Sequence, residues 1–448
     1  MGRTLVVAPW GQPAVWGKAR YVLEQSEMES CTSLGLILER FKGDEVDVAI
    51  LALDSLIDEY FSQPSESQCY TCYDNLRSSI REAATCKSYT DIRARLTNFV
   101  KRFVECLRLP CNPYVVICPA VGSPGGKWRF SGAPTDFEAV VLHELGKQCV
   151  EKAYTRIVLD LTHGINFMPA VVLKLAGELA SLILAAHWEV EEGLENGVEL
   201  HVYNSDPRPS TKEVHRLNLN LVTKDRAKTI LIPHQLSRKL LRRRVMDESL
   251  KTEIDKLNNE YLDAVWLPLS TIYYPLPLAL CEIMLQSNSR APRLILERAF
   301  TLWCERMNID NLNVKRPLAL EPEAVYALLL TEAVNRWLAA GGINSPLMLE
   351  TLEKLANFYK VVNESFYYLI MDEKHRIERN IYRVPGWTPL YQLVSDAKET
   401  SPDKRTMIAH AGLQKEFVEI NTCTMQIRYR IDAKKVVEEA GLVLRVRD

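Results

Sequence analysis

The sequence predicts an α/β N-terminal domain, built on a Rossmann-like parallel sheet, followed by a mostly α-helical C-terminal domain. Two observations predict this division. Short apolar runs alternate with helical patterns over residues 1–205, which is typical of a parallel sheet covered by helices. From about residue 256 onward, the strand patterns give way to long helical patterns. A chain of 448 residues is long enough for two or three domains, each with its own core.

The apolar runs of the N-terminal half predict five strands, which are residues 5–8, 46–52, 114–119, 156–161 and 198–203. The helices predicted between them are residues 33–41, 136–152 and 167–187. In the last helix Lys174 and Glu178 interrupt the apolar residues, so we expect it to cover the sheet and not to span a membrane. Residues 55–110 carry no pattern that we can assign.

Residues 206–255 are predicted to form a linker that is partly helical and basic, because a Pro-rich stretch leads into a cluster of Lys and Arg at 238–244. Such a run is typical of a solvated helix face, and the alternative is a patch that contacts RNA phosphates. Residues 256–448 would then form the helical C-terminal domain. The long helices predicted there are residues 291–306, 322–339, 347–372 and 402–420.

Composition and charge favour a cytoplasmic protein. The chain begins with Met1-Gly2-Arg3 directly before an apolar strand, without the pattern of a secretory signal. The formal net charge of −2 argues against a uniformly basic surface, so any RNA would bind locally. Residues 264–281 carry no charge and have the length of a membrane span, but three prolines interrupt them. This pattern predicts a buried, bent helical hairpin and no contact with a membrane.

The eleven cysteines are scattered along the chain, unlike the dense spacing of a secreted disulfide scaffold. Cys69 and Cys72 are the one close pair at the spacing of a metal knuckle, and Cys106 and Cys111 are the next candidates. A zinc site built from these four residues is one interpretation. Buried free thiols or a disulfide are commoner for such a pair, so we assign no metal site from the sequence.

Ligands of open α/β sheets bind at the carboxyl ends of the strands, so the loops after the first and fourth strands are the candidate site. The first loop begins Pro9-Trp10-Gly11-Gln12-Pro13 and lacks the glycine spacing of a dinucleotide-binding loop. The other reads Asp160-Leu161-Thr162-His163-Gly164-Ile165-Asn166 and leads directly into a helix. Its polar side chains and the free N–H groups of the helix start suit a phosphate ligand. The alternative is a plain turn in which Asn166 caps the helix and His163 is a buried imidazole.

These two motifs resemble the CARF sensor domain of CRISPR-associated ancillary ribonucleases of type III systems. In that family the domain dimerises and binds a cyclic oligoadenylate. The resemblance implies a ligand site lined by Gly11, Thr162, His163, Gly164 and Asn166, and the neighbouring motif residues assigned to it are Trp10, Gln12 and Asp160. A two-fold dimer presents the same patch twice, so a ring with an even number of identical nucleotides can satisfy both copies. Among such rings, the resemblance favours cyclic tetra-adenylate as the activator.

HEPN ribonucleases, the effector half expected in this family, carry an Arg followed, after four to six residues, by a His. The pairs with this spacing are Arg156 with His163, Arg208 with His215, and Arg405 with His410. The first pair falls in the sensor and the second in the Pro-rich stretch. Only Arg405 and His410 fall in a predicted helix of the C-terminal half. A salt-bridging Arg and a surface His are the alternative.

The start of that helix is marked by Ser401 as the cap, Pro402 in the first turn, and Asp403 near the positive end of the helix dipole. Thr406 departs from the family pattern, since many HEPN motifs have Asn or Asp directly after the Arg. A hydroxyl can still form a hydrogen bond at this position, so we expect activity to be retained.

Arg405 and His410 suit RNA cleavage without a metal ion or other catalytic cofactor. The RNA 2′-hydroxyl can attack the neighbouring phosphorus if a side chain takes and returns protons, as His can near neutral pH. Arg can hold two phosphate oxygens at once. The products would carry 2′,3′-cyclic phosphate and 5′-hydroxyl ends. Five residues correspond to roughly 140° of rotation on an α-helix, so we expect a composite site across a homodimer or a higher oligomer.

The sequence therefore predicts a cyclic-oligoadenylate-activated, metal-independent endoribonuclease that cuts single-stranded RNA in type III CRISPR antiviral defence. The alternative is a nucleotide-responsive transcription regulator, in which the same sensor drives a DNA-binding C-terminal half through the basic run 238–244. That half is larger than a winged helix needs, which counts against a regulator. A third interpretation is a catalytically silent sensor that binds a nucleotide and a protein partner.

Overall fold

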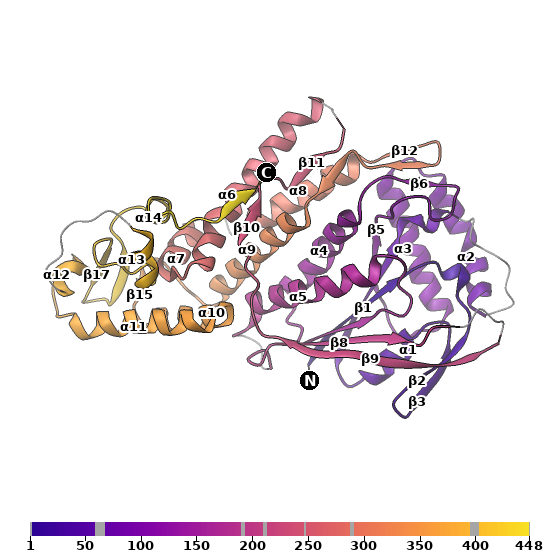
Figure 1. Ribbon diagram of the computed structural model, residues 1–448, viewed down its shortest axis with the longest axis horizontal. Coiled ribbons are helices and arrows are strands. Elements are labelled where there is room, and N and C mark those ends of the chain that lie inside the picture. The colour runs from indigo at the N-terminus through magenta and orange to yellow at the C-terminus, as the bar shows by residue number, and fades with distance from the viewer. Residues whose placement is uncertain are drawn as a thin grey trace.

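The computed structural model describes residues 2–58, 68–189, 193–208, 213–245, 248–286, 291–394 and 403–447. The protein is elongated, with a large sheet and its covering helices at one end and a small α/β region at the other (Figure 1). A layer of long helices lies between them. The chain therefore combines an N-terminal region built on a sheet with a largely helical C-terminal region.

The N-terminal sheet has eight strands in the order β3-β2-β9-β8-β7-β1-β4-β5. All five predicted strands are present and pair in parallel, as β1 (Arg3–Trp10), β4 (Glu45–Leu53), β5 (Tyr114–Cys118), β7 (Arg156–Asp160) and β8 (Val198–Ser205). Their buried runs of Val, Ile and Leu are those of strands covered on both faces.

The expectation of a purely parallel sheet is wrong, because three further strands make it mixed. β2 (Ala19–Leu23) and β3 (Ser26–Ser30) form an antiparallel hairpin. β9 (His215–Ala227) is antiparallel to β8 and parallel to β2. Most side chains of β3 and β9 are polar or exposed, so no apolar run marks these strands in the sequence. Part of the predicted linker, 206–255, is therefore strand, and helix begins there only at residue 248.

The three predicted helices of this region are confirmed as α1 (Leu34–Arg40), α4 (Pro134–Glu151) and α5 (Met168–His187). α4 and α5 lie side by side on one face of the sheet (Figure 1). Among the described helices, α5 alone is long and apolar enough to cross a membrane, and 61% of its apolar stretch is buried inside the protein, as in a core helix. The segment without an assigned pattern supplies α2 (Gln68–Ala84) and α3 (Tyr89–Cys106).

The central helical layer consists of α6 (Lys251–Tyr273), α7 (Pro277–Gln286), α8 (Ala291–Glu305) and α9 (Pro322–Ala340). α8 and α9 confirm two of the predicted helices, and α9 packs on α4 and α5. Residues 264–281 span the end of α6 and the start of α7. They form the bent and largely buried hairpin that the prolines predict.

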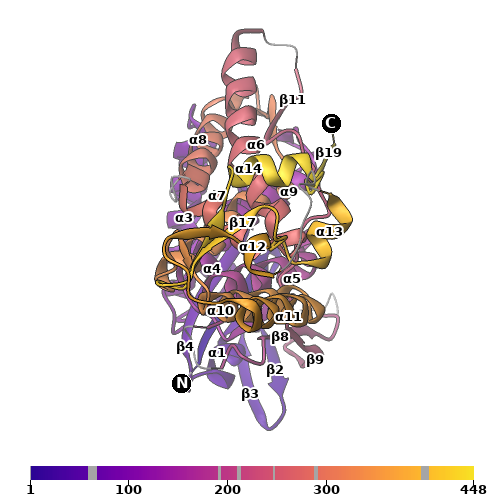
Figure 2. The ribbon, with the colours of Figure 1, turned by 90° about the vertical axis from the view of Figure 1, so that its left-hand side faces the viewer.

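The far end of the protein holds α10 (Thr351–Val362), α11 (Glu364–Asn380), α12 (Leu390–Val394), α13 (Lys404–Ala409) and α14 (Ala433–Glu439). A four-stranded antiparallel sheet accompanies them, in the order β15 (Leu347–Met348), β18 (Gln426–Tyr429), β17 (Val418–Asn421) and β16 (Trp387–Pro389). Figure 2 views this end, where α10 and α11 run beside each other below α14.

The prediction of one helix over residues 347–372 is wrong. Residues 347–348 form β15, and the helical part breaks at Asn363. Asn363 adopts extended backbone, and its side chain accepts a hydrogen bond from Ser365 N at 3.1 Å. It therefore ends α10 and caps α11, which is a preference of Asn that competes with helix continuation.

The prediction of one helix over residues 402–420 is also wrong, since α13 ends at Ala409. Ala411 and Gly412 adopt positive φ angles of 48° and 72°, and the chain turns there toward β17. Ser401 and Pro402 lie outside the described residues. The cap of α13 is Asp403, whose carboxylate accepts hydrogen bonds from the backbone N–H groups of Arg405 and Thr406.

Short strand pairs join distant parts of the chain. They are β6 (Arg129–Phe130) with β13 (Asn313–Lys315), β13 with β12 (Asn308–Asp310), β11 (Leu241–Arg243) with β14 (Leu318–Leu320), and β10 (Gln235–Ser237) with β19 (Arg445–Arg447). The basic run 238–244 thus forms strand and turn, and the expected helix face is wrong. Arg242 pairs with Glu321 at 2.9 Å, and Arg244 pairs with Asp136 at 2.8 Å.

A buried ion pair joins the N-terminal sheet to the C-terminal region. Asp54 directly follows β4, Arg316 directly follows β13, and both side chains are 0% exposed. Arg316 also donates to Ala120 O at 2.8 Å. Asp54 accepts hydrogen bonds from the Tyr89 hydroxyl at 2.9 Å and from Ala120 N at 2.8 Å. Both buried charges therefore have several hydrogen-bonding partners in the N-terminal region. A charge buried this deeply without partners would be very unfavourable.

We expect Asp54→Ala to destabilise the protein strongly, because it leaves the Arg316 guanidinium buried without a carboxylate. Breaking a buried pair costs about 3–5 kcal/mol. The matched control is Glu260→Ala, which breaks a pair with Arg298 whose side chains are 31% and 54% exposed, and it should cost at most about 1 kcal/mol. Thermal unfolding of the two variants and the unmodified protein measures the difference. Equal shifts for both variants would contradict this role of the buried pair.

Candidate functional site

Two loops meet at the carboxyl edge of the N-terminal sheet. A hydrogen bond of 2.8 Å from Gly11 N to His163 O joins the loop after β1 to the loop after β7. A Cβ at Gly11 would lie 2.5 Å from Cγ2 of Ile165, and one at Gly164 would lie 2.7 Å from Cγ of Pro169. Both glycines therefore allow a close approach that a larger residue would prevent. The structure thus brings the two sequence motifs together as one surface.

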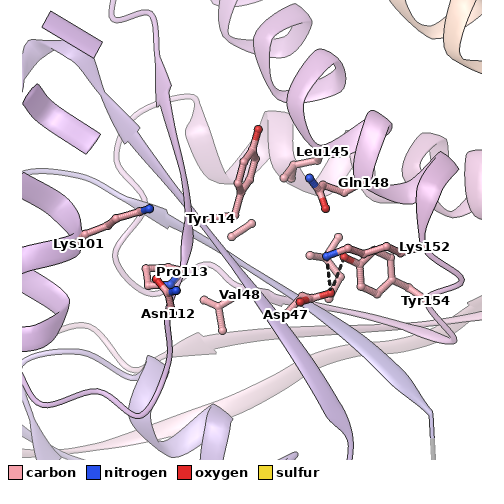
Figure 3. Close-up of a pocket in the computed structure, with 12 residues that line it drawn as sticks. Asp47, Val48, Lys101, Asn112, Pro113, Tyr114, Leu145, Gln148, Lys152 and Tyr154 are labelled. Carbon is pink, nitrogen blue, oxygen red and sulfur yellow. Dashed lines mark hydrogen bonds and ion pairs between the residues drawn. The ribbon is translucent and has the colours of Figure 1, made fainter. Parts of the chain in front are cut away.

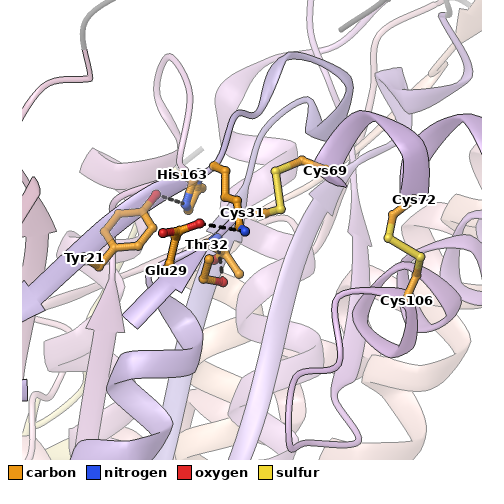
Figure 4. The surroundings of a disulfide bond; sticks show 10 residues. Tyr21, Glu29, Cys31, Thr32, Cys69, Cys72, Cys106 and His163 are labelled. Carbon is orange, nitrogen blue, oxygen red and sulfur yellow. Dashed lines mark hydrogen bonds and ion pairs between the residues drawn. A yellow bond between two sulfur atoms is a disulfide. The ribbon is translucent and has the colours of Figure 1, made fainter. Parts of the chain in front are cut away.

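His163 lies between this surface and the β2–β3 hairpin. Its Nε2 is 3.2 Å from the Tyr21 hydroxyl (Figure 4). Its ring centroid lies 4.2 Å from that of Trp16. Burial lowers the pKa of His163 to about 3, and the nearby Arg208 acts in the same direction. The imidazole is therefore neutral at neutral pH, and it can offer a ligand a hydrogen bond but no charge.

Trp10 and Asp160 lie beneath the loops, since each is only 1% exposed. Trp10 packs edge-on against Trp16 at 5.0 Å between ring centroids. Asp160 accepts hydrogen bonds from the Ser33 hydroxyl at 2.7 Å and from Thr162 N at 3.3 Å. Burial raises the pKa of the Asp160 carboxyl. These two assigned residues thus occupy positions from which they support the loops.

Among the other assigned polar side chains, Gln12 and Thr162 each have a buried oxygen without a hydrogen-bond partner among the described residues, whereas Asn166 is exposed. Gln12 lines a cavity of about 40 Å³ between the loop after β1 and residues 124–125, and its Oε1 is buried without a hydrogen-bond partner among the described residues. Asn166 is exposed and adopts a φ of 53°. The plain-turn alternative is wrong about Asn166, because the residue at the cap of α5 is Phe167. An unpaired amide oxygen beside a cavity of this size can bind a water molecule or a polar atom of a ligand.

Arg208 is a charged group at this edge that the sequence analysis missed. A Cβ at Gly17 would lie 1.8 Å from Nη2 of Arg208, so the guanidinium covers the end of the first loop. Arg208 is exposed, and the described residues supply it with no carboxylate. The sequence analysis assigned Arg208 to the Pro-rich stretch, but Arg208 closely follows β8, whose carboxyl end lies at this edge because β8 runs parallel to β7. It supplies a positive charge next to the neutral His163.

His410 stands at the end of α13 and is held by a carboxylate. Its Nδ1 lies 2.8 Å from Oε1 of Glu373, which comes from α11 and is 7% exposed. Arg376 donates to the other oxygen of Glu373 through Nε at 2.9 Å and Nη2 at 2.6 Å. A carboxylate that accepts from Nδ1 fixes the ring orientation and leaves Nε2 free as a proton acceptor. Glu373 was missed because only the packing of α11 on α13 brings it to His410.

Arg405 occupies the first turn of the same helix. Its side chain is exposed, and no hydrogen bond or ion pair holds its guanidinium within the described part of the chain. Thr406 donates its backbone N–H to Oδ2 of Asp403 at 3.0 Å, and its hydroxyl donates to the same oxygen. The Thr406 hydroxyl and the helix N–H groups lower the pKa of the Asp403 carboxyl. The residue that departs from the family pattern therefore stabilises the start of the helix that carries Arg405.

The other two Arg–His pairs lie in the strands and loops of the N-terminal region. Arg156 opens β7 and is bound by Glu199 at 2.8 Å and by Asp44, at the end of the strand opposite His163. His215 opens β9. Of the three pairs, only Arg405 and His410 lie in the C-terminal region. There a short helix and its C-cap carry an exposed guanidinium and an imidazole that is hydrogen-bonded to Glu373.

The cysteine pair forms disulfides and no metal knuckle. Cys31 is bonded to Cys69, and Cys72 is bonded to Cys106 (Figure 4). The zinc interpretation is therefore wrong, and the disulfide alternative holds, while Cys111 is a free thiol. Within the described ranges, no group of three or more His, Cys, Asp or Glu could hold a metal ion.

Comparison with known families matches both halves of the chain. A family model described as "CRISPR system endoribonuclease Csx1, CARF domain" matches residues 5–207. A second, described as "CRISPR system endoribonuclease Csx1, HEPN domain", matches residues 363–433, which include Glu373, Arg405 and His410. The chain belongs to the CRISPR-associated ancillary ribonuclease family that joins CARF and HEPN domains.

A relative from Methanocaldococcus jannaschii, described as "CRISPR system endoribonuclease Csx1", is 26% identical over 93% of this chain and 86% of its own length. Along this chain, the CARF match precedes the HEPN match. The CARF match ends two residues after β8, and the HEPN match begins at the break between α10 and α11.

A buried carboxylate supports the turn after His410 in the HEPN domain. Glu282 of α7 accepts a hydrogen bond from Tyr429 N at 2.8 Å, and the Tyr429 hydroxyl donates to Gly412 O at 2.8 Å. Burial raises the pKa of Glu282 to about 7, from an ordinary value of 4.5. Between these values the unfolded chain releases the proton while the folded protein retains it. The stability contributed by Glu282 is thus present at low pH and is lost as pH rises through about 7.

We expect Glu282→Gln to reduce the loss of stability between pH 5 and pH 8. The glutamine cannot titrate, and its oxygen can still accept from Tyr429 N. The measurement is the difference in thermal midpoint between the two pH values, compared for the variant and the unmodified protein. This comparison removes the contribution of every other titrating group. An equal or larger fall for the variant would show that Glu282 ionises normally in the folded protein.

Proposed function

We propose that the protein is an endoribonuclease that cuts single-stranded RNA in type III CRISPR defence and is activated by a cyclic oligoadenylate. The observation that carries this proposal is the Glu373–His410 pair beside the exposed guanidinium of Arg405. An imidazole that a carboxylate orients through one ring nitrogen can use the other nitrogen to transfer a proton. An exposed guanidinium without an ion-pair partner is suited to bind a phosphate. Both residues lie within the segment that matches the HEPN domain.

In the proposed reaction, the RNA 2′-hydroxyl attacks the adjacent phosphorus and the 5′-oxygen of the next nucleotide leaves. Nε2 of His410 takes the proton from the hydroxyl or returns one to the leaving oxygen, with Glu373 stabilising the imidazolium that forms between these events. Arg405 holds the non-bridging oxygens through two parallel N–H donors. The products end in 2′,3′-cyclic phosphate and 5′-hydroxyl, and the chemistry needs no metal ion.

One chain carries one proton-moving imidazole and one such guanidinium, whereas the reaction needs a proton acceptor and a donor. Arg405 points into solvent, and no hydrogen bond joins it to His410 in the described residues. We therefore propose that the protein forms a homodimer in which two copies of α13 face each other. This dimer exists by itself or as part of a higher oligomer. A two-fold axis between the two copies of α13 would place two Arg and two His around one cleft.

We propose cyclic tetra-adenylate as the activator, bound at the joined loops of the CARF domain. The contacts would come from Gly11, Gln12, Thr162, His163, Gly164 and Asn166, with Trp10 and Asp160 as support. The orphaned oxygen of Gln12 supports a polar ligand here, the neutral His163 suits an uncharged base or hydroxyl, and Arg208 suits a phosphate. Each copy of a dimer would contact one half of the ring.

The alternative, a transcription regulator, has no observation in its favour. The C-terminal half carries a HEPN match, and Arg242 and Arg244 of the basic run are ion-paired with carboxylates of the same chain. A ribonuclease is therefore the function that the site supports best.

We expect His410→Ala to lose RNA cleavage by at least about a hundredfold, because general acid–base catalysis contributes roughly 10²–10⁴-fold. The fold and the affinity for the activator should be unchanged. The control is His375→Ala, which removes an exposed His from the same helix as Glu373. Gel analysis of labelled RNA measures the rates, and 5′-phosphate product ends would point to a different nuclease chemistry.

We expect the double variant Thr162→Ala, Asn166→Ala to need more activator for the same cleavage rate. Each unsatisfied ligand group costs roughly 1–3 kcal/mol, so we expect a shift of about ten- to a hundredfold. At saturating cyclic tetra-adenylate the rate should recover, because Arg405 and His410 are unchanged. Activator titrations of both proteins test this. Superimposed curves would mean that residues 160–166 do not bind the activator.

A further inference from the structure

A second cavity lies at the opposite edge of the N-terminal sheet from the CARF loops. It has a volume of about 310 Å³ and lies among the first residues of β4 and β5, with α3 and α4 beside it (Figure 3). This volume is within the range of small-molecule sites. Neither the loop motifs nor the Arg405–His410 site includes any residue that lines it.

Three polar side chains at this cavity have no partner in the described part of the chain. They are the ammonium of Lys101 on α3, the amide of Asn112 before β5, and the amide of Gln148 on α4. Lys101 and Asn112 lie on one side of the cavity and Gln148 on the other (Figure 3). The cavity therefore has a cationic end and an end that can both donate and accept hydrogen bonds.

A carboxylate with one unused oxygen stands at the Gln148 side. Oδ2 of Asp47 accepts hydrogen bonds from Arg3 at 3.0 Å, Lys152 at 3.1 Å and Tyr154 at 2.8 Å. Oδ1 of Asp47 accepts none among the described residues. Although burial opposes it, these hydrogen bonds lower the pKa of the Asp47 carboxyl, so it is ionised. Its free oxygen can accept from a hydroxyl group of a ligand.

The middle of the cavity is apolar and includes one aromatic wall. Val48, Ala49 and Leu145 are buried beneath it. The ring of Tyr114 is 39% exposed, and its hydroxyl donates to Glu144 on α4. That hydrogen bond fixes the orientation of the ring, and its open face suits a planar group.

We propose that this cavity binds a nucleoside monophosphate. The phosphate lies at Lys101 and Asn112, and the base lies against Tyr114 with its edge toward Gln148. The ribose hydroxyls donate to Oδ1 of Asp47. A free cation, a free carboxylate oxygen and an aromatic wall around one cavity match these three parts of a nucleotide. The site is separate from the CARF loops and does not rest on the proposed function.

Calorimetric titration of the full-length protein with AMP tests the proposal. We expect saturable binding, with adenosine and inorganic phosphate each binding more weakly, because each lacks one part of the ligand. Lys101→Ala should weaken AMP binding by about tenfold or more, through loss of a charged hydrogen bond. Gln148→Leu should also weaken it. Lys87→Ala, which removes an exposed Lys before the other end of α3, is the matched control and should bind AMP normally.

Three results would overturn the proposal. One is the absence of saturable binding up to millimolar AMP. The second is an unchanged affinity in Lys101→Ala, since the phosphate would then lie elsewhere. The third is displacement of AMP by cyclic tetra-adenylate in both the unmodified protein and Lys101→Ala, which would assign the AMP to the CARF loops. These binding measurements do not depend on ribonuclease activity. A failure to detect RNA cleavage would therefore not affect them.

Discussion

The buried ion pair between Asp54 and Arg316 is the constraint on which the arrangement of the two halves depends. Neither side chain is exposed, so neither charge can lose its partner without a large cost. Asp54 immediately precedes Ser55 and Leu56, which line the small cavity beside Gly11 and Gln12. Arg316 lies between β13 and β14, which connect α8 to α9. The cavity lining at Ser55 is therefore adjacent in sequence to the ion pair that joins the two halves.

From this pair, continuous packing leads to the candidate nuclease site. α9 packs on α4 and α5 of the CARF domain and on α6 and α7 of the helical layer. α7 carries Glu282, which holds Tyr429 and through it the turn after His410. Glu373 orients the imidazole from the other side. The proposed activation requires the activator to bind more tightly to the cleavage-competent arrangement than to the resting one. The packing described above connects the CARF domain, where the activator would bind, to the residues around His410.

Local patterns predicted the parts of the fold whose side chains report their surroundings directly. The buried parallel strands and α1, α4, α5, α8 and α9 follow from apolar runs and periodicity. β9 is not recognisable as a strand from the sequence, because most of its side chains are solvent-exposed. The helices expected over 347–372 and 402–420 are interrupted by Asn363 and by positive φ angles at Ala411 and Gly412. In the candidate site, motifs identified the loops and the Arg405–His410 spacing. Glu373 could not be found that way, because only tertiary packing brings it to His410. Arg208 closely follows the predicted strand over 198–203, so its place at the carboxyl edge could have been inferred from that strand.

The most direct test of the account is cleavage of single-stranded RNA by the unmodified protein in EDTA, with and without cyclic tetra-adenylate. We expect cleavage only when the activator is present, and no further increase in rate when a divalent metal replaces the chelator. Cleavage that requires the metal would contradict the Arg405–His410 chemistry. A rate that is the same with and without the activator would contradict the coupling of the CARF loops to the HEPN domain.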